Sequence, residues 1–369
     1  MIIYSDKTEN LCDYGILIPI DGSRDSSVLA ALKKSGSPFP QKTFGEAAAL
    51  LDLNADSLIT REDLERVHDR AYIARILDGM PLADGFLKTI LEAYELINAD
   101  GSYHRYAPDR AVRPLSDLKS SLLTYAIGTY LALRIALDGK GEPFVNFCFS
   151  LKGGCHHPRY DAPSGFGILN DPVIAVSKIM AEGRASFVWI IDVDAHKGDG
   201  TAELIRLSRA RGETFTAKTP RVLTLSVHMA HGWPLDEESL AKAMPGRAPL
   251  VESDIDVPIE SGEESEYVPR LAEALCKMEE LSRSPYREHG LPDLALVIAG
   301  GDVYEKDGLA STAPIALSLE QIIERDNLIF SFLKKRGIPS GWVAAGGYGP
   351  AAWKPAAAFL TALPNSKQN

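Results

Sequence analysis

The chain has 369 residues, with 39 Lys and Arg against 50 Asp and Glu, and its formal net charge at pH 7 is −11. Hydrophobic residues make up 45% and charged residues 24%, which is ordinary for a globular protein and excludes a disordered, collagen-like or coiled-coil chain. The acidic balance argues against general nucleic-acid binding, which depends on clustered Lys and Arg, and is compatible with a cationic partner.

The cysteine content and the N-terminus give the first expectations about location. Four cysteines form no CxxC pair and are too sparse for a disulfide framework, which indicates a reducing compartment, in the simplest case the cytoplasm. The first ten residues lack a basic segment followed by an apolar one, and no run of about 18 apolar residues occurs. We therefore expect neither a signal peptide nor a membrane span.

The first 140 residues are mainly helical in pattern. Residues 59–77 predict a helix that begins with a capping box at Thr60. The polar segment 99–115 predicts a long surface loop, a kind of segment that often has a function. Residues 116–139 predict a long apolar helix that ends at Gly139, the residue type favoured after a helix C-terminus.

From about residue 140 onward, short apolar runs alternate with helical patterns. The runs are rich in Val, Ile and Phe, as expected of strands buried on both faces. The predicted strands span residues 143–149, 186–194, 221–228, 293–302 and 341–347. The predicted helices span residues 171–183, 201–212, 263–282, 318–336 and 350–362. This alternation predicts βαβ units, and hence an α/β fold with a parallel sheet between helices. The linker-like stretch 282–292 is short enough for a helix-to-strand loop, so we expect one domain.

The segment IIDVDAHKGDG (190–200) carries the strongest chemical signal. Asp192, Asp194 and His196 follow a buried strand at every second position, so they project together at its carboxyl end, where open parallel sheets bind ligands. Carboxylate and imidazole groups suit Zn²⁺ or a similar divalent ion. A strand end with solvated polar residues is the alternative, although two acids and a histidine after such an apolar run are costly to bury without a cation.

Three further segments place polar residues after predicted strands. They contain the pair His156 and His157, then Asp302, and finally Tyr348. Each is weak evidence alone, because loop histidines, strand-capping aspartates and tight turns are common. Together the four segments supply two Asp and one His as metal ligands, with one position open as in catalytic zinc sites. They add a histidine pair for proton transfer and a hydroxyl for oxyanion stabilisation.

These motifs resemble the histone deacetylase superfamily of zinc-dependent amidohydrolases, which includes acetylpolyamine amidohydrolases and shares its fold with arginase. The resemblance covers roughly residues 60–363 and is carried by GGCHHPRYDAPSGFGILND, DVDAHKGDGT, LSVH, AGGDVYEKDG and GGYG, in family order. It implies one catalytic domain over residues 1–369, with an open, mostly parallel eight-stranded sheet flanked by helices, the arginase/deacetylase fold.

The resemblance also implies roles for residues at the metal. Zn²⁺ would be held by Asp194, His196 and Asp302, with Fe²⁺ as the alternative ion. His157 would be the general base, and His156 its electrostatic partner. The remaining catalytic positions are two acids that hydrogen-bond the histidines and a hydroxyl that polarises the scissile carbonyl: Asp192, Asp199 and Tyr348.

The implied substrate contacts lie on several loops. The channel for an acyl-lysine would be formed by the Gly165-Phe166 segment and Trp233, with Leu309 at its mouth. Asp109 is a stand-in for the family acid that binds the substrate backbone. Arg24 matches a family arginine near a cavity behind the metal, and the pair Asp192 and Ser226 matches a structural K⁺ site. The sequence departs from the family at Lys197, which stands where the family usually has a histidine.

The first functional hypothesis is zinc-dependent hydrolysis of an N-acetyl amide on a lysine side chain of a protein or peptide. A small N-acylamine such as an acetylpolyamine is the second. An arginase-like ureohydrolase with two manganese ions and a non-catalytic acyl-lysine binder are the less favoured alternatives. We expect acylated lysine or amine partners, no nucleic acid and no membrane, and a homodimer is compatible with the sequence.

Overall fold

The computed structural model describes residues 1–7, 9–54, 57–80, 84–211, 221–235, 250–283 and 290–363. Within these ranges the chain forms one eight-stranded sheet in which every pair of neighbouring strands is parallel. The predicted α/β fold with an eight-stranded parallel sheet is thereby confirmed. The strand order is β2-β1-β3-β8-β7-β4-β5-β6, and the strands are β1 (Ile2–Tyr4), β2 (Gln41–Thr43), β3 (Phe147–Ser150), β4 (Phe187–Asp192), β5 (Arg221–Met229), β6 (Ile255–Ile259), β7 (Leu294–Ala299) and β8 (Ser340–Ala344).

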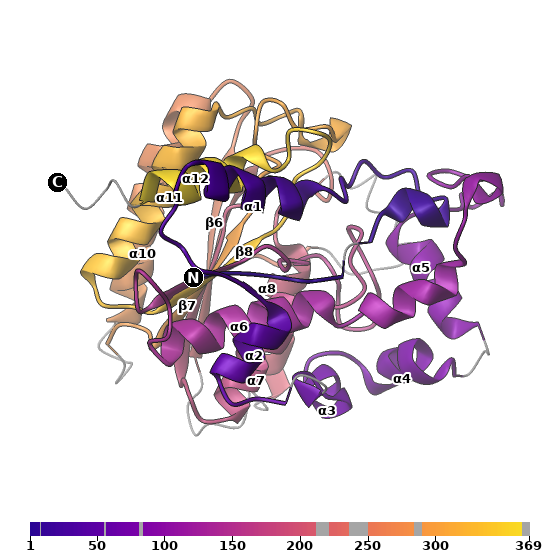
Figure 1. The fold of residues 1–369 in the computed structure, drawn as a ribbon, viewed down its shortest axis with the longest axis horizontal. Helices are drawn as coiled ribbons and strands as arrows, with labels where there is room; N and C mark the ends of the chain where they lie inside the picture. The colour runs from indigo at the N-terminus through magenta and orange to yellow at the C-terminus, as the bar shows by residue number, and fades with distance from the viewer. Residues whose placement is uncertain are drawn as a thin grey trace.

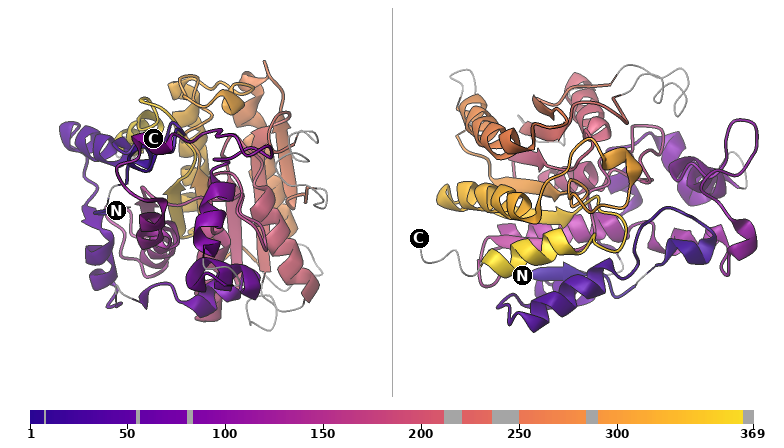
Figure 2. Two further views of the ribbon diagram at one scale, coloured as in Figure 1. Left: turned by 90° about the vertical axis from the view of Figure 1, so that its right-hand side faces the viewer. Right: turned by 90° about the horizontal axis from the view of Figure 1, so that it is seen from above.

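Helices cover both faces of this sheet (Figure 1). One face carries α1 (Arg24–Lys34), α10 (Tyr267–Ser282), α11 (Leu319–Lys335) and α12 (Lys354–Ala362). The other carries α2 (Phe44–Leu50), α6 (Thr124–Leu137), α7 (Asp171–Ala181) and α8 (Asp199–Arg211). Figures 1 and 2 place α4 (Arg70–Asp78) and α5 (Gly85–Ala93) at the end of the molecule away from the C-terminus, and α3 (Arg61–Glu65) contacts both α4 and α7. The described residues also form short 3₁₀ helices, which are η1 (Leu11–Tyr14), η3 (Pro108–Arg110), η4 (Leu115–Ser121), η6 (Glu264–Glu266) and η7 (Ala310–Thr312).

Alternation along the strands divides the core into two clusters, one under each helical layer. Trp189 and Ile191 of β4 pack with α10 and α11, whereas Val188 and Ile190 pack with α6 and α7. Because both faces are covered, the central strands have no polar side, which explains their continuous apolar runs.

The five predicted strands are present, but three further strands complete the sheet. Two of them, β1 and β2, are only three residues long, and the edge strand β6 contains Pro258. The predicted strand at 143–149 begins only at Phe147.

Two predicted helices are interrupted. The single helix over 59–77 is wrong: α3 ends at Glu65, and α4 starts after Asp69, whose side chain accepts hydrogen bonds from Ala71 and Tyr72 as a new N-cap. The capping box at Thr60 is present. The predicted helix over 116–139 is divided into two parts: its first part is the 3₁₀ helix η4, and only its second part, α6, is α-helical.

The segment Leu115–Leu137 is long and apolar enough to cross a membrane by length and composition. However, more than half of its apolar window is buried, and α6 packs against β3, β8 and α7. The apolarity of this segment is therefore that of a helix in the core of a domain.

Candidate active site

Three buried side chains gather at the carboxyl ends of β4 and β7. Asp194 and His196 follow β4, and Asp302 follows β7. The Nδ1 atom of His196 lies 3.3 Å from Oδ1 of Asp194 and 3.1 Å from Oδ2 of Asp302. One potential ligand atom from each residue lies within 4.8 Å of the others, and all three residues are buried. The structure therefore brings together the three residues for which the sequence predicts metal binding.

Glycines allow the loops after β4, β7 and β8 to approach one another this closely. A Cβ atom on Gly300 would lie 2.5 Å from the Cα atom of Asp194, and one on Gly346 would lie 2.5 Å from carboxylate oxygens of both aspartates. The backbone N–H of Gly346 donates to Oδ2 of Asp194, at 2.9 Å, and that of Ala195 donates to Oδ1 of Asp302, at 3.0 Å. Each carboxylate thus has one oxygen bound to a backbone N–H group while its other oxygen faces the His196 ring, and Oδ1 of Asp194 also accepts from the N–H of His196, at 3.1 Å.

The donor set fits a divalent metal ion. Ligand atoms about 2.0–2.1 Å from a zinc ion form a tetrahedron with edges of about 3.3 Å, which agrees with the separations around His196. Without an ion, burial opposes charge on His196, but its hydrogen bonds to the two carboxylates raise its pKa to about 9. Burial, together with the charge of Asp194, raises the pKa of Asp302 to about 6. Two buried carboxylates facing each other indicate a place for a cation.

The two adjacent histidines lie beside this cluster on the loop after β3. Nδ1 of His156 lies 2.5 Å from Oδ2 of Asp192, and Nδ1 of His157 lies 2.7 Å from Oδ1 of Asp199. Burial lowers the pKa of His157 to about 4, and charge on His156 adds to this effect. Its Nδ1 is engaged, so a neutral His157 presents Nε2 as a proton acceptor at neutral pH.

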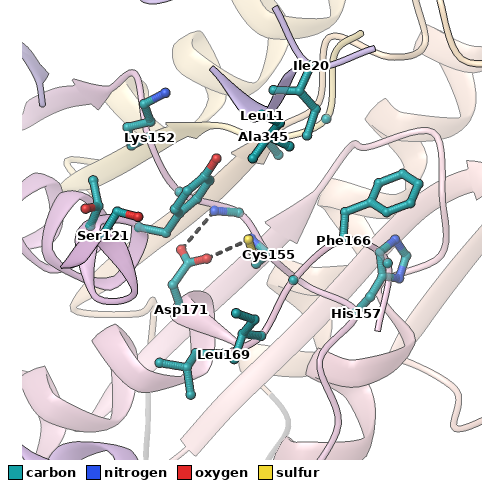
Figure 3. Close-up of a pocket in the computed structure, with 18 of the residues that line it drawn as sticks. Leu11, Ile20, Ser121, Lys152, Cys155, His157, Phe166, Leu169, Asp171 and Ala345 are labelled. Atoms are coloured by element: carbon teal, nitrogen blue, oxygen red, sulfur yellow. Dashed lines mark hydrogen bonds between the residues drawn. The ribbon is translucent and has the colours of Figure 1, made fainter. Parts of the chain in front are cut away.

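The loop that carries both histidines is held by hydrogen bonds from Asn170 and Asp171, which the sequence analysis did not predict. The carboxylate of Asp171 accepts hydrogen bonds from the backbone N–H groups of Gly154 and Cys155 (Figure 3). Nδ2 of Asn170 donates to the carbonyl oxygens of His156 and Pro158. Such a polar pair at the start of an apolar helix is the signal that could have identified these residues.

Aromatic side chains surround His157 and the metal-binding cluster. The rings of Trp233 and His157 meet edge to face with centroids 4.5 Å apart, and Trp233 lies 5.5 Å from the ring of His196. Phe166 and Tyr348 form a second edge-to-face pair at 6.1 Å. Gly165 is required here, because a Cβ atom on it would lie 2.2 Å from Cδ2 of His157.

Tyr348 follows β8, and its backbone is fixed by the half-buried carboxylate of Asp307. Its N–H donates to Oδ2 of Asp307, at 2.7 Å, and its carbonyl accepts from Gly308, at 3.0 Å. Burial, together with the charge of Asp302, raises the pKa of Asp307 to about 7. Burial also raises the pKa of the Tyr348 hydroxyl well above its usual value, so this group is a hydrogen-bond donor at neutral pH.

A cavity runs from this cluster into the molecule. Figure 3 shows His157 and Phe166 at one end of it and Ser121 and Lys152 at the other. Tyr348 and Arg24 also line this cavity. The guanidinium of Arg24 donates a hydrogen bond to the carbonyl oxygen of Ala345. Arg24 therefore lines the same cavity as Asp194 and His196, and its match to a family arginine near a cavity behind the metal stays a prediction.

Other predicted residues lie outside this cavity. Asp109 is exposed in η3, and it does not line the cavity. Leu309 is half-buried at the start of η7, two residues before Ser311, whose Oγ lies 3.3 Å from Nε2 of His196. The structure gives neither residue a contact with the cluster, so their substrate-binding roles stay predictions.

Asp192 and Ser226 are register partners on β4 and β5, as a shared K⁺ site requires, and that site also stays a prediction. Lys197 is buried, and its ammonium lies 2.5 Å from Oδ2 of Asp256 on β6. This contact turns the Lys197 side chain toward the edge strand of the sheet.

The histone deacetylase domain matches residues 19–363. Histone deacetylase 2 of Arabidopsis thaliana is 25% identical over 221 residues, which are 60% of this chain and 48% of that protein. Histone deacetylase 14, chloroplastic, of the same species is 25% identical over 283 residues, which are 75% and 58% of the two chains.

An uncharacterized protein of Picosynechococcus sp. is 29% identical over 227 residues, which are 61% of this chain and 62% of that protein. The aligned regions thus span only 48% to 62% of these three relatives. A crystal structure of acetylpolyamine aminohydrolase from Burkholderia pseudomallei matches with a TM-score of 0.60 and 19% identity over 97% of both chains. This likeness shows a common fold.

Proposed function

The chain belongs to the histone deacetylase domain family, and from this premise we propose that it is a metal-dependent amidohydrolase that removes an acyl group, in the first place acetyl, from a lysine side chain. The observation that carries the proposal is the buried Asp194, His196 and Asp302 cluster with the two histidines and Tyr348 around it. We further propose that residues 1–369 form one catalytic domain, since the family match runs almost from end to end.

Zn²⁺ held by Asp194, His196 and Asp302 is the proposed metal, with Fe²⁺ as the alternative. When bound, it would supply a Lewis acid that polarises the scissile carbonyl and lowers the pKa of water toward about 7. The two carboxylates and the imidazole would hold the ion through three protein groups, as catalytic rather than structural zinc sites do.

Proton transfer is assigned to His157. Its Nδ1 is engaged by Asp199, so Nε2 accepts the proton of the attacking water as the C–O bond forms. The imidazolium then returns this proton to the amine nitrogen as the C–N bond breaks, which leaves a carboxylic acid and a free amine. Asp199 stabilises the imidazolium, and His156, held by Asp192, sets the local charge.

The hydroxyl of Tyr348 donates a hydrogen bond to the carbonyl oxygen as negative charge develops on it. Trp233 and Phe166 provide aromatic surfaces beside His157 and Tyr348, and such surfaces suit the linear alkyl chain of a lysine.

Hydrolysis of an acetylpolyamine is the second candidate substrate reaction. It is favoured by the common fold with the Burkholderia acetylpolyamine aminohydrolase. Against it stands the position of Arg105, whose guanidinium lies 5.3 Å from the ring centre of Phe166 and pairs with Glu95. The Glu95 carboxylate is already engaged by this guanidinium, so the pair offers the second ammonium of a polyamine no free carboxylate.

An assay of the purified chain with an acetyl-lysine peptide and with acetylpolyamines tests the proposal, with Tyr348→Phe as the control for contaminating hydrolases. Turnover of the peptide that depends on Tyr348 is the expected result. Turnover of the polyamine alone would exclude the first substrate class, and turnover of neither would contradict the amidohydrolase assignment. The cytoplasmic location and the absence of nucleic-acid and membrane partners stay predictions, as does the compatibility with a homodimer.

A further inference from the structure

A buried arginine contacts both loops that carry the metal-binding residues, the loop after β4 and the loop after β7. Arg325 is in the middle of α11, on the sheet face that also carries α1, α10 and α12 (Figure 1), and its side chain is 1% exposed. Its Nη1 atom donates to the carbonyl oxygens of Val193 and Gly300, both at 2.9 Å. Neither contact uses a residue of the proposed reaction.

These two carbonyls lie where the β4 and β7 ladder ends. The last paired residues of the two strands are Asp192 and Ile298, and Val193 still donates to the carbonyl of Ile298, at 3.0 Å. Beyond this point the loops leave the sheet, and buried carbonyls there need another donor. One guanidinium nitrogen carries two hydrogens, so Nη1 of Arg325 satisfies both carbonyls and ties the two loops together.

These two hydrogen bonds of Arg325 hold the backbone next to the metal-binding residues. Val193 immediately precedes Asp194, and Gly300 lies two positions before Asp302. The loops already touch, because a Cβ atom on Gly300 would lie 2.5 Å from the Cα atom of Asp194. Hydrogen bonds from Gly346 and Ala195 fix the carboxylates, and Arg325 fixes the carbonyls behind them.

The charge of the guanidinium is balanced within the helix. Nε of Arg325 donates to Oδ1 of Asp326, at 2.8 Å, and Asp326 is 2% exposed. The pair brings little net charge near the metal-binding residues. Its effect on them is therefore geometric, through the two carbonyls.

We propose that Arg325 is a positioning residue that sets the spacing between the Asp194 and Asp302 loops and thereby the affinity of the site for its metal ion. The inference rests on the proposed function, because it assumes that these residues bind a metal. Partners behind metal ligands typically change metal affinity by about 10- to 100-fold when they are replaced.

The test is a zinc titration of the metal-stripped full chain against a chromophoric chelator. Arg325→Met is expected to raise the zinc Kd by about 10- to 100-fold. Asp326→Asn keeps the guanidinium on both carbonyls, so it should lower thermal stability while zinc Kd stays within about twofold of the parent value. The matched control is Arg336→Met in the residue that follows α11, where the guanidinium binds Glu279 and the carbonyl of Phe332, far along the helix from the loops.

A second variant covers the case in which Arg325→Met does not fold, since it leaves Asp326 buried without its partner. Arg325→Met combined with Asp326→Leu replaces the pair by apolar groups and leaves no buried charge. Cobalt absorption adds a readout of geometry: altered visible bands in both Arg325 variants, but not in Arg336→Met, are expected.

An unchanged zinc Kd and an unchanged cobalt spectrum in a folded Arg325 variant would overturn the inference while leaving the proposed function intact. Equal weakening in Arg336→Met would overturn it as well, since the effect would then be one of general stability. Failure of the parent chain to bind zinc or cobalt would overturn both the metal assignment and the inference.

Discussion

His156 and His157 are adjacent in the chain, and their ring centroids lie 4.0 Å apart, yet each is bound to a different carboxylate. Burial opposes charge on both rings. Even so, the carboxylates of Asp192 and Asp194 raise the pKa of His156 to about 10, whereas burial and charge on His156 lower the pKa of His157 to about 4. One ring is therefore charged and the other neutral near pH 7, which divides electrostatic and proton-transfer roles between them.

Replacement of the neutral histidine should be the most damaging change to the reaction. His157→Ala removes the proton acceptor, and we expect kcat to fall by about 10²- to 10⁴-fold with the metal content unchanged. Steady-state kinetics and metal analysis of the same preparation check this. Full turnover by a metal-loaded His157→Ala variant would contradict the mechanism.

The Tyr348 hydroxyl is expected to act on the transition state more than on substrate binding. Tyr348→Phe should lower kcat by about 10²- to 10³-fold with little change in KM, because the hydrogen bond strengthens as charge develops on the carbonyl oxygen. Tyr304→Phe in the preceding loop is the control, since Tyr304 does not line the cavity. A matched loss in both variants would point to a disturbed loop rather than a lost donor.

Metal removal should abolish turnover and lower thermal stability together. Chelation leaves Asp194 and Asp302 facing each other without a cation, and readdition of Zn²⁺ should restore both activity and Tm. Metal analysis is expected to give about one ion per chain. A value near two would favour the ureohydrolase alternative, and activity that survives exhaustive chelation would exclude the metal-dependent reaction.

His68 provides a test of stability against pH. Its Nδ1 donates to the carbonyl of Arg159, and its Nε2 accepts from the N–H of Asn170, so only the neutral ring satisfies both contacts. Burial lowers its pKa to about 4 from an unfolded value of 6.5. Between these values the unfolded chain binds more protons, so stability is present above pH 6.5 and is lost as the pH falls toward 4.

The size of this loss is of the order of 3 kcal/mol from the difference in pKa. Denaturant unfolding at pH 7 and pH 4.5 measures it, and His68→Gln should show a shallower decline than the parent. His104→Gln at the exposed histidine of the 99–115 loop should decline like the parent. A parallel decline in His68→Gln would show that His68 does not cause it.

Strand prediction succeeded where burial on both faces leaves a continuous apolar run, as in β4 and β7. It failed for β1 and β2, which are too short to show a period, and for β6, where Pro258 suggests a loop although Ile255, Val257 and Ile259 alternate toward the core. The helix boundary at Asp69 was missed because the apolar pattern continues on both sides of this residue and hides its capping signal.

The sequence by itself determined which residue types follow each strand, because side-chain alternation and hydrophobicity are local properties of the chain. It placed Asp194 and His196 at one strand end and predicted that other strand ends contribute to the same site. Only the tertiary structure decided the distances between them. The neighbours of β4 in the sheet, and thus the 3.1 Å contact between His196 and Asp302, depend on strand order. The contacts of Arg325 and Asp307 depend on long-range packing, which leaves no periodic trace in the sequence.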